Sequence, residues 1–391
     1  MSKAPATAAP RRISRSLKVL DRLAGIPLAI VLALTPKRPV VDGKRIRRIG
    51  LMKTAAIGDT LLLAGLLEDI RRAHPNASLV FIAGPDNIHA ARLLTGRADE
   101  HVIVSPRAPL AAVGAIRRAK LDVIVDFGSW PRFDALLAAL SGADFRVGFK
   151  TDGQFRHYGF DRAVEHSNSV HERENYRRLV GEIGVEASTE PRVAVPRALP
   201  PDRMPARPYI VFHPWSGGYL GTVKEWPGDR WVGLAQRLQA RQWHIVVTGA
   251  AGDRQKSELL VDQLRSAGLA ATNVAGVFSL AEVADVLTAS EIVVSVNTGL
   301  MHLAALLGAR TVSLEGPTPV RRWGPIGPRV RSVTTTFDRC GYLDLGFEYA
   351  GQRLDCMEGI SVDAVVAAVD DLITATATTA PNAAPAITSK A

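Results

Sequence analysis

The sequence alternates short, continuously apolar segments with longer leucine-rich segments, and it does so in two separate halves. The apolar segments are 47–53, 77–84, 101–106 and 121–128 in the first half, and 209–214, 243–249, 291–297 and 311–316 in the second. Strands that are apolar on both faces and that alternate with helices indicate a parallel sheet covered on each side. Five prolines in residues 193–209 separate the two halves and indicate a linker. The pattern predicts an α/β protein with two domains.

This division predicts five segments along the chain. We expect a basic, partly apolar arm at 1–45, a first domain at 46–195, a linker at 196–208, a second domain at 209–375 and a disordered, low-complexity tail at 376–391. Ligands of open α/β sheets lie at the carboxyl ends of the strands. The strand ends of both sheets are therefore expected to face one cleft between the domains.

The positive charge of the chain belongs to the arm. Residues 1–50 hold 12 Lys or Arg and 2 Asp, whereas the whole chain has a net charge of +10, so the remainder is neutral. Binding to a nucleic-acid duplex needs a basic surface on the folded body. We therefore expect no nucleic-acid partner, and a basic arm fits an anionic membrane surface better.

An uncharged stretch of the arm runs over residues 23–36. It is shorter than the roughly 20 residues that cross a bilayer. Three interpretations remain: a helix lying in the membrane interface, which we favour, an element packed on the body, or a secretion signal.

Cys340 and Cys356 are the two cysteines of the sequence. Two cysteines do not make a disulfide framework, so we expect buried free thiols in a reducing compartment. The sequence has no Cys/His cluster with zinc spacing, and we predict no metal and no cofactor. It also lacks the dinucleotide-binding and Walker glycine patterns, so a bound phosphate would be held by amides, hydroxyls and cations.

The segment "EIVVSVNTGLMHLAALLGAR" offers such a phosphate site, because a strand runs directly into a helix. The first amides of a helix are unpaired and its dipole is positive there, and Gly299 allows close approach to the backbone. From the pattern alone, Asn297 or Thr298 is better explained as the N-cap of that helix. His302, one turn further on, is either a packing residue or a ligand facing outward beyond the strand ends.

Two other loops follow strand ends in the second half. The first, "HPWSGGYLGTVKEWP", supplies Ser216, Thr222 and Lys224, and it is alternatively a flexible loop with a solvated lysine. Trp226 at its end is a candidate core anchor. In the second, "VVTGAAGDR", Asp253 is placed to accept hydrogen bonds from ribose hydroxyls.

Asp59 in "MKTAAIGDTLL" stands where a strand meets a leucine-rich helix in the first half. It is either the N-cap of that helix or a carboxylate that takes a proton from an attacking hydroxyl. Burial would raise its pKa and the helix dipole would lower it, and the sequence leaves the balance open.

Taken together, the motifs resemble glycosyltransferase family 9, the heptosyltransferase family. The resemblance runs from about Arg47 to about Asp371. It rests on "MKTAAIGDTLL", "VIVDFGSWPRFDALLAALSGADFRVGF", "HPWSGGYLGTVKEWP", "TGAAGDR", "VNTGLMHLAALLGARTVSLEGPTPVRRWGP" and "CMEGISVDAVVAAV".

The resemblance implies a GT-B fold, in which two Rossmann-like domains bind the acceptor and the nucleotide-sugar respectively. It also implies inverting, metal-independent transfer with Asp59 as the catalytic base. The implied donor-binding residues are Ser216, Thr222, Lys224, Asp253, Asn297, Thr298, Gly299, Leu300 and His302. Lys224 and the turn at 298–302 would hold the diphosphate, and Asp253 the ribose.

The sequence departs from the family pattern at two donor-side positions. Asn297 stands where the family usually has an aspartate, and Glu315 where it usually has an aromatic residue. Fold and base are therefore predicted more firmly than the identity of the donor.

The expected function is transfer of a sugar onto a lipopolysaccharide-like or other cell-surface glycan, with heptose from ADP-heptose as the expected donor. A nucleotide-sugar epimerase of the same architecture and a non-catalytic binding relative are the alternatives. We expect a cytoplasmic protein in peripheral contact with the anionic inner membrane.

Overall fold

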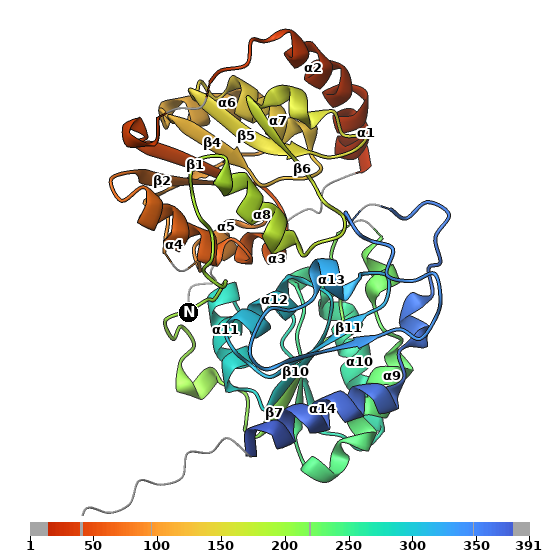
Figure 1. Ribbon diagram of the computed structural model, residues 1–391. Helices are drawn as coiled ribbons and strands as arrows, with labels where there is room; N and C mark the ends of the chain where they lie inside the picture. Colours follow the sequence, from red (N-terminus) through yellow and green to blue (C-terminus); the bar gives the residue numbers. More distant parts are fainter. Residues whose placement is uncertain (1–14, 40–41, 95, 219, 347, 378–391) are drawn as a thin grey trace, which may run out of the picture.

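The computed structural model describes residues 15–39, 42–94, 96–218, 220–346 and 348–377. Two lobes are visible in Figure 1, each built on a parallel sheet of six strands with helices on its faces. The strand order is β3-β2-β1-β4-β5-β6 in the first sheet and β12-β11-β10-β7-β8-β9 in the second. The predicted two-domain α/β architecture is confirmed, whereas the linker bounds at 196–208 stay a prediction.

The first sheet consists of β1 (Arg48–Lys53), β2 (Ser78–Ala83), β3 (Glu100–Ile103), β4 (Val123–Asp126), β5 (Phe145–Lys150) and β6 (Arg162–Glu165). Its domain also contains the helices α3 (Ile57–Leu61), α4 (Ala64–Ala73), α5 (Ile88–Ala91), α6 (Pro109–Arg118), α7 (Arg132–Leu140) and α8 (Glu172–Gly181), and the 3-10 turn η3 (Arg156–Gly159).

The second sheet consists of β7 (Tyr209–His213), β8 (His244–Val247), β9 (Ala271–Asn273), β10 (Ile292–Val296), β11 (Thr311–Glu315) and β12 (Val330–Thr334). Its helices are α9 (Gly228–Arg237), α10 (Arg254–Ser266), α11 (Leu280–Ala289), α12 (Gly299–Leu306), α13 (Val320–Trp323) and α14 (Val362–Ala377), with the 3-10 turns η5 (Gly221–Lys224) and η8 (Cys356–Gly359). The last helix thus runs two residues into the predicted tail, and residues 378–391 lie outside the described part of the chain.

The apolar strands are explained by the two covered faces of each sheet. In β2, Leu79 and Phe81 belong to one hydrophobic cluster, whereas Val80 and Ile82 belong to another. Successive side chains of a strand point to opposite faces, so both faces of this sheet are buried.

The leucine-rich segment after β1 is not the single helix that its pattern predicts. It forms α3 and α4, with a turn at 62–63 between them. The Leu63 amide donates to the Thr60 carbonyl, and this shorter bond ends the first helix. The break separates the short helix that carries Asp59 from the longer helix that packs on the sheet.

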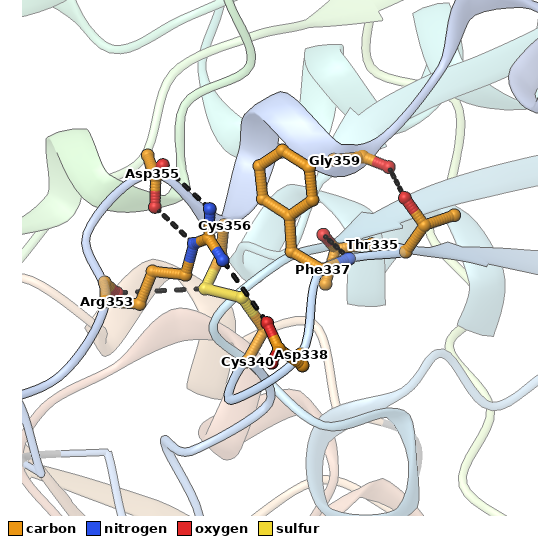
Figure 2. Close-up of a disulfide and its surroundings, with 9 residues drawn as sticks. Thr335, Phe337, Asp338, Cys340, Arg353, Asp355, Cys356 and Gly359 are labelled. Atoms are coloured by element: carbon orange, nitrogen blue, oxygen red, sulfur yellow. Dashed lines mark hydrogen bonds and ion pairs between the residues drawn. A yellow bond between two sulfur atoms is a disulfide. The ribbon is translucent and has the colours of Figure 1, made fainter.

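The prediction of free thiols is wrong, because Cys340 and Cys356 form a disulfide (Figure 2). Their Cα atoms are 5.8 Å apart, because the chain between them folds back on itself. The Gly341 amide donates to the Gly316 carbonyl, so the closed loop lies against the turn that follows β11.

The N-terminal arm forms α1 (Arg15–Leu23), α2 (Gly25–Val31) and the 3-10 turn η1 (Leu32–Leu34), on the flank of the first lobe (Figure 1). The Asp21 carboxylate accepts hydrogen bonds from the Arg132 guanidinium and the Phe133 amide of α7, both at 3.1 Å. Gly25 and Ala29 of α2 are buried. One face of the arm therefore packs on the body. No helix in the described part of the chain is long and apolar enough to span a membrane.

Candidate active site

The two domains meet where α3 and α12 begin. A Cβ atom on Gly58 would lie 2.7 Å from Cδ2 of His302, and one on Gly299 would lie 2.7 Å from Cβ of Ile57. These glycines allow the first turns of the two helices to approach closely. Gly299 was predicted to let a ligand approach the backbone closely, and in the structure Ile57 and Gly58 of the first domain lie against it.

Asp59 lies at this boundary and forms an ion pair with Lys53. Its Oδ2 is 2.8 Å from Nζ of Lys53, which is buried and also donates to the Phe127 carbonyl at 3.2 Å. The N-cap of α3 is Ala56, at a φ of 69°, so the capping interpretation of Asp59 is wrong. The carboxylate is instead held by a lysine at the end of β1.

Tyr176 of α8 lies behind this ion pair. Nζ of Lys53 is 5.6 Å from the centre of the Tyr176 ring, and the ring packs edge-on against Phe127. Burial and the nearby charge of Asp59 raise the pKa of Tyr176 well above its ordinary value, so the phenol stays neutral. Neither Lys53 nor Tyr176 was predicted as a site residue. Lys53 carried a signal, because it ends an apolar strand six residues before Asp59.

Thr298 is the N-cap of α12, as one of the two interpretations predicted. Its Oγ1 accepts a hydrogen bond from the Met301 amide at 3.4 Å. His302 does not face outward, because its ring is buried against Gly58. Burial and the nearby charges of His171 and Lys224 lower the pKa of His302 to about 3, so the ring is neutral at pH 7. Leu300 is partly buried and packs against the core.

Lys224 connects the two sides of the boundary electrostatically. Burial lowers the pKa of Lys224, and the carboxylates of Glu315 and Asp59 raise it. A cation of the second domain therefore lies within electrostatic reach of the proposed base of the first. This arrangement favours the site interpretation of Lys224 over that of a solvated loop lysine.

The remaining candidates for donor binding, Ser216, Thr222 and Asp253, have no contact with Asp59 or Lys224 among those described above. Ser216 is buried, and its amide donates to Glu225, whereas Thr222 is exposed. The Asp253 carboxylate accepts from the Ala250 amide at 3.0 Å and pairs with Lys256 at 3.1 Å. These contacts order the loop after β8, and the ribose role of Asp253 stays a prediction. Trp226 is a core anchor, as predicted, with its indole donating to the Ile360 carbonyl.

Asn297 is bound to Glu315 and does not cap the helix. Its Nδ2 lies 3.0 Å and 2.9 Å from the two carboxylate oxygens of Glu315 and donates also to the Trp323 carbonyl at 2.9 Å. The two residues that depart from the family pattern are therefore direct partners. Neither departure alone indicated this pairing.

A buried ion pair also joins the domains. Arg322 of α13 donates to Glu172 of α8 at 2.8 Å, and both side chains are fully buried. Glu172 accepts further hydrogen bonds from His166 and Asn175. The adjacent His171 ring is 3.1 Å from the Gly324 carbonyl. The contact fixes the second-domain segment after β11 against the first domain.

A second group of acidic side chains is buried in the first domain. Asp126 at the end of β4 pairs with Arg156, and Asp134 of α7 accepts from the Thr54 hydroxyl at 2.7 Å. Burial and the neighbouring charge of Asp126 raise the pKa of Asp134 to about 7. Thr54 directly follows Lys53, so this group adjoins the ion pair of Asp59.

The family model of glycosyltransferase family 9 (heptosyltransferase) matches residues 115–340, which is more than half of the chain. The chain belongs to glycosyltransferase family 9. The lipopolysaccharide heptosyltransferase 1 of Pseudomonas aeruginosa is 39% identical over 118 residues, which are 30% of this chain and 31% of that protein. The match thus spans about a third of the length of the curated relatives.

Two of the solved structures that resemble this chain cover most of its length. The ADP-heptose heptosyltransferase II of Escherichia coli has a TM-score of 0.67 at 18% identity, covering 84% of this chain and 99% of that one. The E. coli heptosyltransferase WaaC with ADP has a TM-score of 0.59 at 20% identity, covering 83% and 99%. These similarities confirm the predicted GT-B fold.

Among the described residues, no group of three or more His, Cys, Asp or Glu side chains could hold a metal ion. Metal-independence and the absence of a cofactor stay predictions.

Proposed function

We propose that this member of glycosyltransferase family 9 is an inverting transferase that moves heptose from ADP-heptose onto a lipopolysaccharide-like or other cell-surface glycan acceptor. The observation that carries the proposal is the position of Asp59. The carboxylate is paired with Lys53 at 2.8 Å, on the helix whose first turn meets the N-terminus of α12. A base on one domain thus adjoins a helix N-terminus suited to a diphosphate on the other.

In the proposed reaction an acceptor hydroxyl attacks the anomeric carbon of the donor while Asp59 removes its proton. The new C–O bond forms as the bond between the anomeric carbon and the diphosphate oxygen breaks, which inverts the configuration. Negative charge grows on the departing diphosphate, where Lys224 and the first amides of α12 would stabilise it. Lys53, 2.8 Å from the carboxylate, would orient Asp59 toward the attacking hydroxyl before the proton moves.

The two domains would divide the substrates between them. The first would bind the acceptor, and the second the nucleotide-sugar through Lys224, Thr298 and His302, with Ser216, Thr222 and Asp253 as further contacts. An adenine nucleotide is supported by the ADP in the WaaC structure, which shares this fold. Family membership supports transfer over epimerisation.

Calorimetric binding of ADP, UDP and GDP to the chain and to Lys224→Ala tests the donor side. We expect selective ADP binding that the variant weakens at least tenfold. A preference for UDP or GDP would contradict the ADP donor.

Transfer of heptose by Asp59→Asn tests the base. General base catalysis contributes about 10²- to 10⁴-fold, so the variant should lose about that much turnover while retaining ADP affinity. Asp99→Asn is the matched control, because Asp99 is a carboxylate of the same domain that pairs with Arg71 on the surface. Turnover above a tenth of the original in Asp59→Asn would remove Asp59 as the base.

The N-terminal arm would hold the enzyme at the membrane that carries its acceptor. One face of the arm packs on the body, and seven large apolar side chains of the arm are exposed: Val19, Leu20, Leu23, Leu28, Ile30, Val31 and Leu34. Single exposed apolar residues are normal on a protein surface, but seven within 16 residues form a patch. The exposed cation Arg22 lies among these side chains, and Lys37 and Arg38, which are exposed but bonded to the body, follow them; positive charge beside apolar side chains suits an anionic lipid surface. The proposed location is therefore the cytoplasmic face of the inner membrane.

Sedimentation with vesicles that contain anionic lipid tests this contact. Deleting residues 1–40 would also remove the Asp21–Arg132 pair, so substitutions are sharper than truncation. We expect Leu20→Ser with Leu23→Ser to lower vesicle binding at least threefold. Leu110→Ser, which changes an exposed leucine of α6, should leave it unchanged. Equal binding by all variants would make the arm a packing element.

A further inference from the structure

Glu315 is a buried carboxylate at the donor side that the proposed mechanism does not use. It is 1% exposed and ends β11, while Asn297 follows the neighbouring parallel strand β10. The carboxyl ends of parallel neighbours lie at one edge of the sheet, which brings the two side chains together. The carboxylate accepts from Nδ2 of Asn297 and, at 2.9 Å, from Oγ1 of Thr318.

These bonds connect Glu315 to the start of α12. Asn297 directly precedes Thr298, which caps the helix, and Asn297 is 7% exposed. Its amide group is held by Glu315 on one side and by the Trp323 carbonyl on the other. A displaced carboxylate at 315 would therefore remove two of the three contacts that hold Asn297, the residue before the N-cap.

Glu315 also interacts with the cation of the same site. The positive charge of Lys224 in η5 attracts the carboxylate and lowers the pKa of Glu315. The other groups that face the carboxylate are uncharged donors: Asn297, Thr318 and Ser313. Asp59 of α3, in the first domain, also attracts this lysine and raises the pKa of Lys224. Burial raises the pKa of Glu315 to about 7, and the hydrogen bonds and Lys224 oppose that rise. The charge of the carboxylate is therefore sensitive to a further anion.

We propose that Glu315 is a positioning residue of the donor site, whose carboxylate holds Asn297 and the N-terminus of α12 and balances Lys224 until a nucleoside diphosphate binds. This inference rests on the proposed function, because it takes α12 and Lys224 as the diphosphate site. An arriving diphosphate repels the carboxylate and favours its protonated form. Diphosphate binding should then take up a proton and weaken as the pH rises through about 7.

A reciprocal exchange tests the pair with ADP as the probe. Asn297→Asp alone puts two carboxylates in contact, so ADP affinity at pH 8 should fall at least tenfold. Adding Glu315→Gln restores one carboxylate and one amide with the hydrogen bond between them reversed. The bond to the Trp323 carbonyl stays lost, so affinity should recover at least threefold from the single variant without fully reaching the original. Asn273→Asp is the matched control, because Asn273 donates to Glu258 at 2.7 Å on the surface of the same domain and should leave ADP affinity unchanged.

Calorimetry in two buffers with different ionisation enthalpies supplies a second readout. The unmodified chain should take up a fraction of a proton on binding ADP near pH 7.5, and Glu315→Gln alone should take up almost none. Unchanged ADP affinity in Asn297→Asp, no recovery in the double variant, or equal proton uptake in Glu315→Gln would each overturn the role of Glu315. No ADP binding by the unmodified chain would instead refute the proposed donor, and with it this inference.

Discussion

The buried pair of Glu172 and Arg322 yields a stability prediction with a definite magnitude. Burial alone would raise the pKa of Glu172, but the charges of His166 and Arg322 and the hydrogen bonds that the carboxylate accepts outweigh burial and lower the pKa to about 2. A difference of one pH unit in a pKa corresponds to about 1.4 kcal/mol. Lowering the pKa from 4.5 to about 2 therefore contributes about 3 kcal/mol to the folded state.

We expect Glu172→Gln to lower the free energy of unfolding by about 3 kcal/mol at pH 7, in line with the roughly 3–5 kcal/mol lost on breaking buried pairs. Because the folded pKa is depressed, this stabilisation is complete above pH 4.5 and is lost as the pH falls toward 2. The difference between variant and original should shrink by about 1.4 kcal/mol between pH 7 and pH 3.5.

Urea denaturation at several pH values, followed by circular dichroism, measures both effects. Glu174→Gln is the matched control on the same helix, because Glu174 pairs with Arg173 and Arg177 near the surface. Exposed pairs contribute about 0–1 kcal/mol, so this control should change little. A loss below about 1 kcal/mol in Glu172→Gln, or a loss that does not vary with pH, would refute the reasoning.

Three further predictions follow from the geometry. Gly58→Ala should lower the free energy of unfolding by about 1–3 kcal/mol, measured by thermal unfolding, because its Cβ would lie 2.7 Å from His302. Gly181→Ala in α8 is the control, and it should not destabilise the protein because no atom beyond its chain neighbours and its own helix backbone would lie within 4 Å of its Cβ. Lys53→Met should lower turnover at least tenfold with ADP affinity kept, and the opposite split would contradict its role beside Asp59. Thiol titration of the unfolded, unreduced protein should find no free thiol, and two titratable thiols would contradict the disulfide. The double variant Cys340→Ser with Cys356→Ser should lower the free energy of unfolding by about 3 kcal/mol, as expected for a closed loop of this length.

Local sequence was enough to predict the elements that depend on local pattern. The apolar runs that became β1, β2 and β4 were recognisable because strands buried on both faces tolerate few polar residues. Four strands were missed: β5, β6, β9 and β12. The strands β6 and β12 have exposed positions and a mixed composition, β9 has only three residues, and Arg146 interrupts the apolar run of β5. The N-cap at Thr298 was predictable because a cap bonds only within its own helical turn.

The sequence by itself determined the two-domain α/β fold, the place of Asp59 at a strand-to-helix edge and the family of the chain. Only the tertiary structure decided which charges are paired. Lys53 and Asp59 meet because β1 leads into α3. Glu172 and Arg322 are 150 residues apart, and Asn297 follows β10 whereas Glu315 ends β11. A buried charge needs a partner, but the partner is chosen by the packing of strands and domains, which no local pattern records.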